Sequence, residues 1–160
     1  MKKIVLAGLA ATMPLSLAAC GGSEPDVMVE EDPNSLPGTQ ITNGRFVLPA
    51  VAGNPAAIYF DLTYGGERDT VIRRVDVAGA QSAMLHETVE QNGSATMVET
   101  FQLRVGAGET VKFEPGGRHI MAMGLDSEIT EGTVVEVTLT FVGGDKASFP
   151  ATVQTAGEDR

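Results

Sequence analysis

Apolar and polar residues alternate along most of this sequence after Phe46, and no other feature restricts its fold as strongly. Apolar side chains occupy every second position in two clear runs: Ile58, Phe60, Leu62 and Tyr64, and then Val135, Val137, Leu139 and Phe141. Shorter runs repeat the pattern: Phe101, Leu103 and Val105, and Val111 with Phe113. A period of two with one polar face indicates half-buried antiparallel strands. The sequence therefore predicts an all-β domain of about seven short strands, built as a β-sandwich or barrel.

Turn-forming residues separate these runs. They are Gly65-Gly66, Asn92-Gly93, Gly106-Ala107-Gly108, Pro115-Gly116-Gly117 and Gly143-Gly144. Asn-Gly is the strongest short signal for a two-residue β-hairpin. If this pair forms such a turn, Thr88 faces Met97 and His86 faces Glu99 across the hairpin. His86 and Met97 then lie on one face as diagonal neighbours, whereas a slip of one residue would separate them.

The first 19 residues have the features of a bacterial export signal. Lys2 and Lys3 give a basic start, and an apolar run follows that is short for a membrane span. The run ends in Leu17-Ala18-Ala19-Cys20, which resembles the lipobox of bacterial lipoproteins. This resemblance implies a lipoprotein signal peptide of residues 1–19 and a lipidated Cys20, at the periplasmic face of a bacterial membrane. An ordinary secretory signal is the alternative.

After Cys20 the sequence divides into a tether, one domain and a tail. Residues 20–40 hold five acidic residues, three prolines and no basic residue, so we expect an acidic, flexible tether. Residues 41–155 suffice for one domain, and residues 156–160 form the tail. The single cysteine cannot form a disulfide within the chain. The net charge of −10 argues against nucleic acid as a partner, and we expect membrane contact only through the lipid.

Two histidines and two methionines form a spaced set in this domain: His86, Met97, His119 and Met121. No other histidine is present in the sequence. His119 and Met121 are two residues apart and share a face if their segment is extended. Imidazole nitrogen and thioether sulfur suit Cu(I), whereas zinc prefers His, Cys and carboxylate, and calcium and magnesium prefer oxygen. Blue-copper centres use a cysteine thiolate, so the set favours binding and transfer of Cu(I) over redox turnover.

The pattern His-x10-Met-x21-His-x-Met resembles the signature of the periplasmic copper chaperone family PCu(A)C. The similarity extends from about Leu48 to Val153 and includes the segment from Lys112 to Leu125. It implies a cupredoxin-like, Greek-key antiparallel β-sandwich that holds Cu(I) near one end through His86, Met97, His119 and Met121. It also implies an extracytoplasmic chaperone that delivers copper to a cuproprotein, such as the CuA site of cytochrome c oxidase. Three further residues are expected to lie beside the ligands without necessarily binding the ion: Met84, Met123 and Arg118.

Other interpretations compete with this one. A methionine in a strand is usually a core residue, and a single histidine is more often a satisfied polar group than a ligand. The alternative function is therefore a membrane-anchored β-sandwich interaction module without a metal role, whose methionines form an apolar contact patch. An enzyme is not expected, because the sequence has no nucleophile elbow, phosphate loop or metallohydrolase motif.

Overall fold

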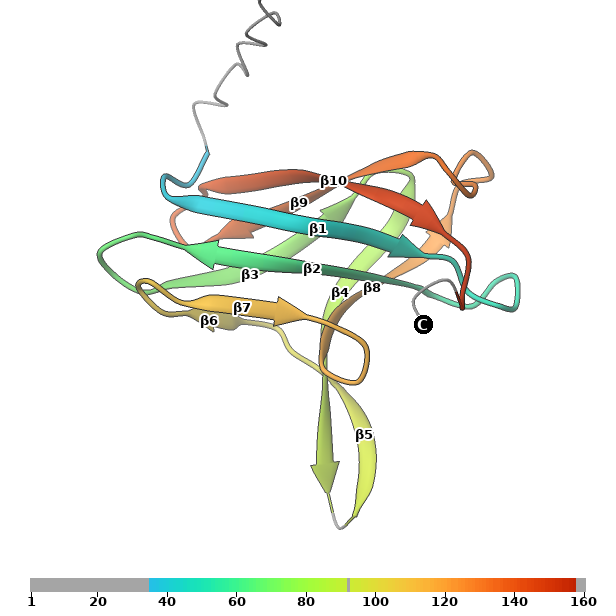
Figure 1. Cartoon of the computed structure of the whole chain (residues 1–160), viewed down its shortest axis with the longest axis horizontal. Helices are drawn as coiled ribbons and strands as arrows, with labels where there is room; N and C mark the ends of the chain where they lie inside the picture. The colour runs from blue at the N-terminus through green and yellow to red at the C-terminus, as the bar shows by residue number, and fades with distance from the viewer. Residues whose placement is uncertain (1–34, 92, 158–160) are drawn as a thin grey trace, which may run out of the picture. The chain divides into compact units, whose positions relative to one another are not determined.

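Ten strands form the part of the chain that this computed structural model describes, residues 35–91 and 93–157 (Figure 1). In chain order they are β1 (Thr39–Val47), β2 (Ala56–Tyr64), β3 (Thr70–Val77), β4 (Ala80–Gln91), β5 (Ser94–Glu99), β6 (Leu103–Val105), β7 (Thr110–Phe113), β8 (Arg118–Leu125), β9 (Val134–Phe141) and β10 (Lys146–Gln154). No residue in those two ranges is helical, which confirms the all-β prediction. The expected signal peptide and Cys20 lie outside the described residues.

The folded part begins slightly earlier than the sequence suggests. The N–H of Leu36 donates to the carbonyl of Lys146 at 2.8 Å, and β1 starts at Thr39. The last two residues of the stretch 20–40, assigned to the tether from composition, therefore already belong to β1, and Ser35 forms an isolated bridge with Lys146. Within the described ranges there is no helix with the length and apolar character needed to cross a membrane.

All ten strands join in one sheet with the order β5-β4-β8-β7-β2-β1-β10-β9-β3-β6, and β8 also pairs with β2. Most neighbours are antiparallel, as expected, but the sheet is mixed. β1 and β10 pair in parallel, as do β7 and β8 at Phe113 and Arg118. In the sequence, almost the whole domain lies between β1 and β10. The pairing of β1 with β10 joins the first described strand to the last.

The hydrophobic core follows the alternation of the sequence. Ile58, Phe60 and Leu62 on β2 are fully buried, and the residues between them are only half-buried. Phe60 stacks on Phe113 with ring centres 4.0 Å apart. The prediction that Phe101 belongs to the same strand run as Leu103 and Val105 is wrong. β6 starts only at Leu103, and Phe101 is 76% exposed.

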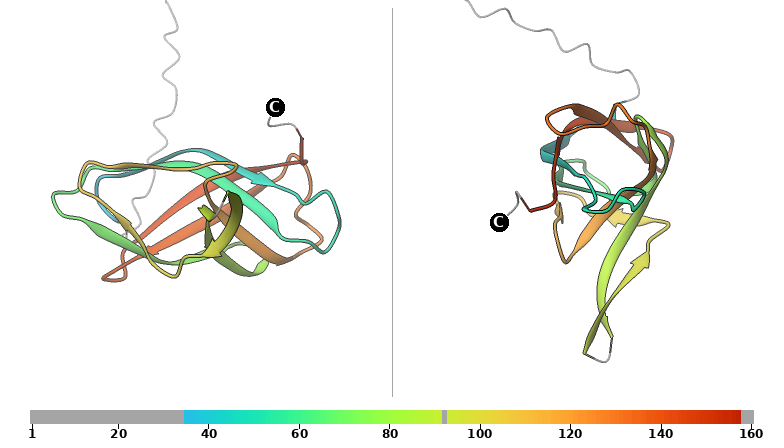
Figure 2. Two further views of the ribbon diagram at one scale, coloured as in Figure 1. Left: turned by 90° about the horizontal axis from the view of Figure 1, so that it is seen from below. Right: turned by 90° about the vertical axis from the view of Figure 1, so that its right-hand side faces the viewer.

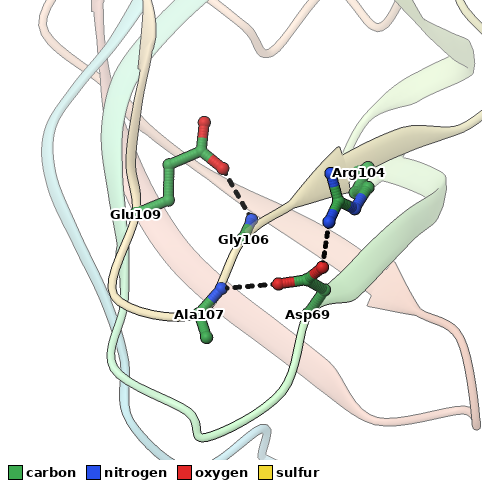
Figure 3. A network of polar contacts seen from close by, with 5 residues as sticks. All are labelled: Asp69, Arg104, Gly106, Ala107 and Glu109. Atoms are coloured by element: carbon green, nitrogen blue, oxygen red, sulfur yellow. Dashed lines mark hydrogen bonds and ion pairs between the residues drawn. The ribbon is translucent and has the colours of Figure 1, made fainter.

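A network of exposed polar contacts fixes the turn between β6 and β7 (Figure 3). Asp69 accepts a hydrogen bond from the N–H of Ala107 at 2.9 Å and pairs with Arg104. Glu109 accepts from the N–H of Gly106 at 2.6 Å. Asp69 thus ties the β2–β3 loop to the β6–β7 turn. The pKa of Asp69 is lowered, first by the Ala107 N–H and then by Arg104, because both stabilise the carboxylate.

The β4–β5 hairpin extends away from the other strands (Figures 1 and 2). β4 is long enough to pair with β8 through its first half and with β5 through its second half. The hairpin register is the predicted one: Gln91 faces Ser94, Thr88 faces Met97, and His86 faces Glu99. Among the described strands, β5 pairs only with β4, and all six of its residues are exposed.

Candidate metal centre

The predicted site residues lie on the outer face of the sheet, opposite the core. On β8, His119, Met121 and Met123 alternate with Ile120 and Ala122, which are completely buried in the core. Successive side chains on a strand point to opposite faces, so these three residues face outward. The prediction that His119 and Met121 share a face is therefore confirmed.

The pairing of β4 with β8 brings the two halves of the set together. His86 lies directly opposite His119, and Met84 lies directly opposite Met121. The two imidazole rings have centres 5.8 Å apart and are inclined by 66°. His86 Nδ1 contacts the Sδ atom of Met121. Three of the four predicted ligands thus come from adjacent positions on two neighbouring strands.

The His119 ring is oriented by a backbone carbonyl two residues earlier in the chain. Its Nδ1 lies 3.1 Å from the carbonyl oxygen of Gly117. A carbonyl only accepts, so Nδ1 carries the proton in this contact, and Nε2 is the nitrogen with a lone pair. A hydrogen bond of this kind commonly fixes the tautomer of a metal-binding histidine. His119 is only 7% exposed despite its place on the outer face.

Met97 reaches the same region from the projecting hairpin. A surface cavity of about 370 Å³ is lined by Met97, His119 and Met121, together with Tyr59 and Thr88. Met97 itself is 61% exposed. Three of the four predicted ligands therefore line one cavity, and His86 adjoins it through its contact with Met121.

The pKa of His86 is lowered below its ordinary value of 6.5. Burial is the main cause, because it penalises the charged imidazolium, and the neighbouring His119 adds to the effect. Glu99, directly opposite His86 on β5, acts in the other direction. A lowered pKa keeps the ring neutral at physiological pH, and only a neutral imidazole binds a metal ion.

Of the three residues expected beside the ligands, two lie on the ligand face of the sheet and one lies on the opposite face. Met84 and Met123 are half-buried on the same face as the predicted ligands, and Met123 lies opposite Ser82. Arg118 precedes His119 and therefore points to the other face. There it pairs with Glu87, its partner on β4, with Nη2 and Oε1 3.0 Å apart. Arg118 is thus directed away from the side chains of the predicted ligands.

Sequence reasoning missed Tyr59 and Arg45. The ring of Tyr59 lies 6.4 Å from that of His119, and the Arg45 guanidinium lies 5.5 Å from the centre of the Tyr59 ring. The one available signal was an aromatic residue on the polar side of β2. In residues 35–91 and 93–157, no group of three or more His, Cys, Asp or Glu side chains could hold a metal ion.

Similar structures share the fold of this chain. The copper-bound PCuAC domain from PmoF2 has a TM-score of 0.61 and 18% identity, over 74% of this chain and 93% of that domain. The solution structure of CuI-DR1885 from Deinococcus radiodurans has a TM-score of 0.59 and 26% identity, over 79% of this chain and 84% of that protein. These likenesses confirm the expected cupredoxin-like fold.

Sequence comparisons identify the family. The model of the family described as "Putative lipoprotein LpqE-like" matches residues 39–153, which include all of the strands except the last residue of β10. The putative lipoprotein Lxx21020 of Leifsonia xyli subsp. xyli (strain CTCB07) is 31% identical over 153 residues, covering 95% of this chain and 90% of that protein. The chain therefore belongs to the LpqE-like family of putative lipoproteins.

Proposed function

We propose that this chain is a Cu(I)-binding protein that carries copper outside the cytoplasm and hands it to an acceptor cuproprotein. The observation that carries the proposal is the strand register. His86 lies opposite His119 and contacts Met121, and Met97 lines one cavity with His119 and Met121. His86, Met97, His119 and Met121 are the proposed ligands.

The chemistry of these donors supports Cu(I) as the cargo. Thioether sulfur is a soft donor, and neutral imidazole is compatible with Cu(I) as well. The lowered pKa of His86 keeps that ring available as a neutral ligand, and the Gly117 contact of His119 leaves Nε2 of the second ring as the donor atom. A thioether also has an advantage outside the cytoplasm, because it cannot form a disulfide.

The comparisons point in the same direction. Two of the similar structures are described as a copper-bound PCuAC domain and as CuI-DR1885. They support a fold that can hold copper, and the cavity of this chain offers suitable donors on the outer face.

Transfer follows from the position of Met97. A carrier must release its ion to a partner, and ligand exchange needs at least one ligand that the partner can reach. Met97 is exposed on a projecting hairpin, whereas His119 is buried. We infer that an acceptor displaces Met97 first and the β8 ligands last. The CuA site of cytochrome c oxidase is the acceptor that the resemblance to copper chaperones suggests.

The same proposal includes membrane anchoring. The family is described as putative lipoproteins, and Cys20 follows a lipobox-like sequence. We infer that a lipid on Cys20 holds the domain at the periplasmic face of a bacterial membrane. Loss of membrane association in a Cys20→Ala variant, measured by fractionation of cells, would be the expected result. Retention of that variant in the membrane fraction would contradict the anchor.

Competition with a coloured Cu(I) chelator tests the binding. We expect the wild-type chain to withdraw Cu(I) from the chelator, and a His86→Ala, His119→Ala double variant to lose this ability. Met97→Leu and Met121→Leu should each weaken binding, whereas Met28→Leu, in the expected tether, is the matched control. Undiminished affinity in the double histidine variant would exclude the proposed site and favour the interaction module without a metal role.

A further inference from the structure

A row of side chains continues the proposed copper site across five strands. Glu99 on β5 faces His86 on β4, and His86 faces His119 on β8. Beyond His119 the row reaches Tyr59 on β2, whose ring lies 6.4 Å from the imidazole. Tyr59 faces Arg45 on β1, whose guanidinium lies 5.5 Å from the centre of the phenol ring. The row therefore has a carboxylate at one end and a guanidinium at the other.

A β-bulge in β1 places Arg45 in this row. The register of β1 against β2 shifts between Thr42 and Arg45, so that one extra residue of β1 is accommodated. Without the shift, Arg45 would face Ile58 and point into the core, because a slip of one residue exchanges the two faces. The bulge therefore puts Arg45, the only charged residue of β1, on the same face as Tyr59.

Two neighbouring residues are adapted to the bulge. Asn43 has a positive φ of 59°, which asparagine tolerates better than most residues, and its Nδ2 donates to Asp61 Oδ2 at 2.7 Å. A Cβ atom on Gly44 would lie 2.5 Å from the carbonyl oxygen of Pro150, so a larger residue does not fit there. Bulges of this kind often re-aim a side chain next to a functional site.

We infer that Arg45, stacked on Tyr59, shifts the oxidation-state preference of the copper site further toward Cu(I) and away from Cu(II). This inference rests on the proposed copper function. From the two ring distances, the guanidinium is at most about 12 Å from the His119 ring. It repels a divalent ion about twice as strongly as a monovalent ion at the same place. Tyr59 holds the guanidinium by a cation–π contact and places an aromatic wall beside His119.

The size of the effect follows from Coulomb's law. For one additional unit of charge at about 12 Å, and an effective dielectric constant between about 20 and 80, the relative affinity changes about two- to tenfold. Glu99 lies on the other side of His86 and has the opposite charge. Removing its charge should therefore change the preference in the opposite direction from removing that of Arg45.

The test measures the affinities of the full chain for Cu(I) and for Cu(II) separately, by competition with a chelator for each ion at fixed ionic strength. Arg45→Gln should raise the affinity for Cu(II) relative to Cu(I) about two- to tenfold. Glu99→Gln should lower it, and Arg45→Lys, which keeps the charge, should change it less than Arg45→Gln. Lys146→Gln is the control, because Lys146 lies six residues along β10 from Thr152, the partner of Arg45, or about 20 Å away.

The outcomes separate the inference from the proposed function. A ratio of affinities that is the same in Arg45→Gln as in the wild type, or that falls, would overturn the role of Arg45. If the wild type still bound Cu(I) in that experiment, the copper function would stand. If the wild type bound no Cu(I), both would be overturned.

Discussion

His86 and His119 face each other directly across the pairing of β4 with β8, with ring centres 5.8 Å apart. Their spacing is set by the hydrogen bonds of a sheet and does not depend on the conformation of a long loop. The same register places Met84 opposite Met121. The remaining proposed ligand, Met97, depends instead on the short hairpin that joins β4 to β5.

The turn of that hairpin should therefore control copper affinity. Gly93 has a positive φ of 78°, and an added Cβ would meet no atom within 4 Å. In Gly93→Val, a residue with a β-branched side chain is strained by about 1–2 kcal/mol or more at such a φ. If the hairpin must re-form to bring Met97 to the ion, Cu(I) affinity should fall about 5- to 30-fold in the chelator competition.

Gly108→Val is the matched control for this change. Gly108 has a φ of 73° and equally open surroundings, but it lies in the β6–β7 turn. We expect comparable strain there and an unchanged Cu(I) affinity. An equal loss of affinity in both variants would mean that general destabilisation, not the position of Met97, is responsible.

The lowered pKa of His86 predicts how the stability of the metal-free protein depends on pH. At neutral pH the ring is neutral in both the folded and the unfolded chain, so it contributes nothing. As the pH falls through 6.5, the unfolded chain binds a proton that folded His86 resists, because of burial and the neighbouring His119. The free energy of unfolding should therefore decrease between pH 7 and pH 5, as measured by urea titration.

Two further measurements check whether His86 causes this pH dependence. In a His86→Gln variant, the decrease in stability over this range should be smaller than in the wild type. The proton competes with Cu(I) for the same ring, so copper affinity should also weaken as the pH falls. An affinity that stays constant down to pH 5 would contradict ligation by histidine.

The Phe60–Phe113 pair should dominate the stability of the core. Both rings are almost completely buried and stack 4.0 Å apart, and Phe149 packs against Phe60 at 4.6 Å. Replacing Phe60 with alanine leaves a cavity among these rings and should cost about 3–5 kcal/mol of unfolding free energy. Urea denaturation would measure it. An exposed apolar residue, Val134, gives the control, since Val134→Ala should change stability little.

The Asp69 network should stabilise the β6–β7 turn only while the carboxylate is charged. The N–H of Ala107 and the Arg104 side chain both hold its pKa below 3.8, so its contribution is present above that pH and is lost as the pH falls through the lower, folded value. Asp69→Asn should lower the Tm at pH 7 and make the Tm less sensitive to acid.

Asp76→Asn is the control for this change. Asp76 pairs only with Arg74, two residues away on the same strand, among the contacts that the structure shows for it. An exposed ion pair within one strand contributes little, so the Tm should remain close to that of the wild type. Equal effects of the two substitutions would mean that Asp69 does not tie the two loops together.

The local parts of the fold and site could be predicted from the sequence. The Asn92-Gly93 pair fixes the register of a two-residue hairpin, and alternation fixes the faces of β2 and β9. The opposition of His86 and His119 could not be derived in this way, because it depends on the pairing of strands distant in sequence. Only the resemblance to copper chaperones implied it.

The residues that were predicted wrongly or missed also have physical explanations. Phe101 continues the apolar alternation of Leu103 and Val105, but it lies in the connection before β6 and is exposed. Arg45 was missed because a bulge changes its face, and the hydrophobic pattern does not reveal a bulge. Arg118 is adjacent to His119 in sequence, yet it points to the opposite face and pairs with Glu87.

X-ray absorption spectroscopy at the copper edge of the Cu(I)-loaded chain tests the proposed site most directly. The four ligands predict a first shell that contains both nitrogen from imidazole and sulfur from thioether. The sulfur contribution should decrease in Met97→Leu and in Met121→Leu and vanish in the double variant. A shell without sulfur in the wild type, or one unchanged by both substitutions, would contradict the site.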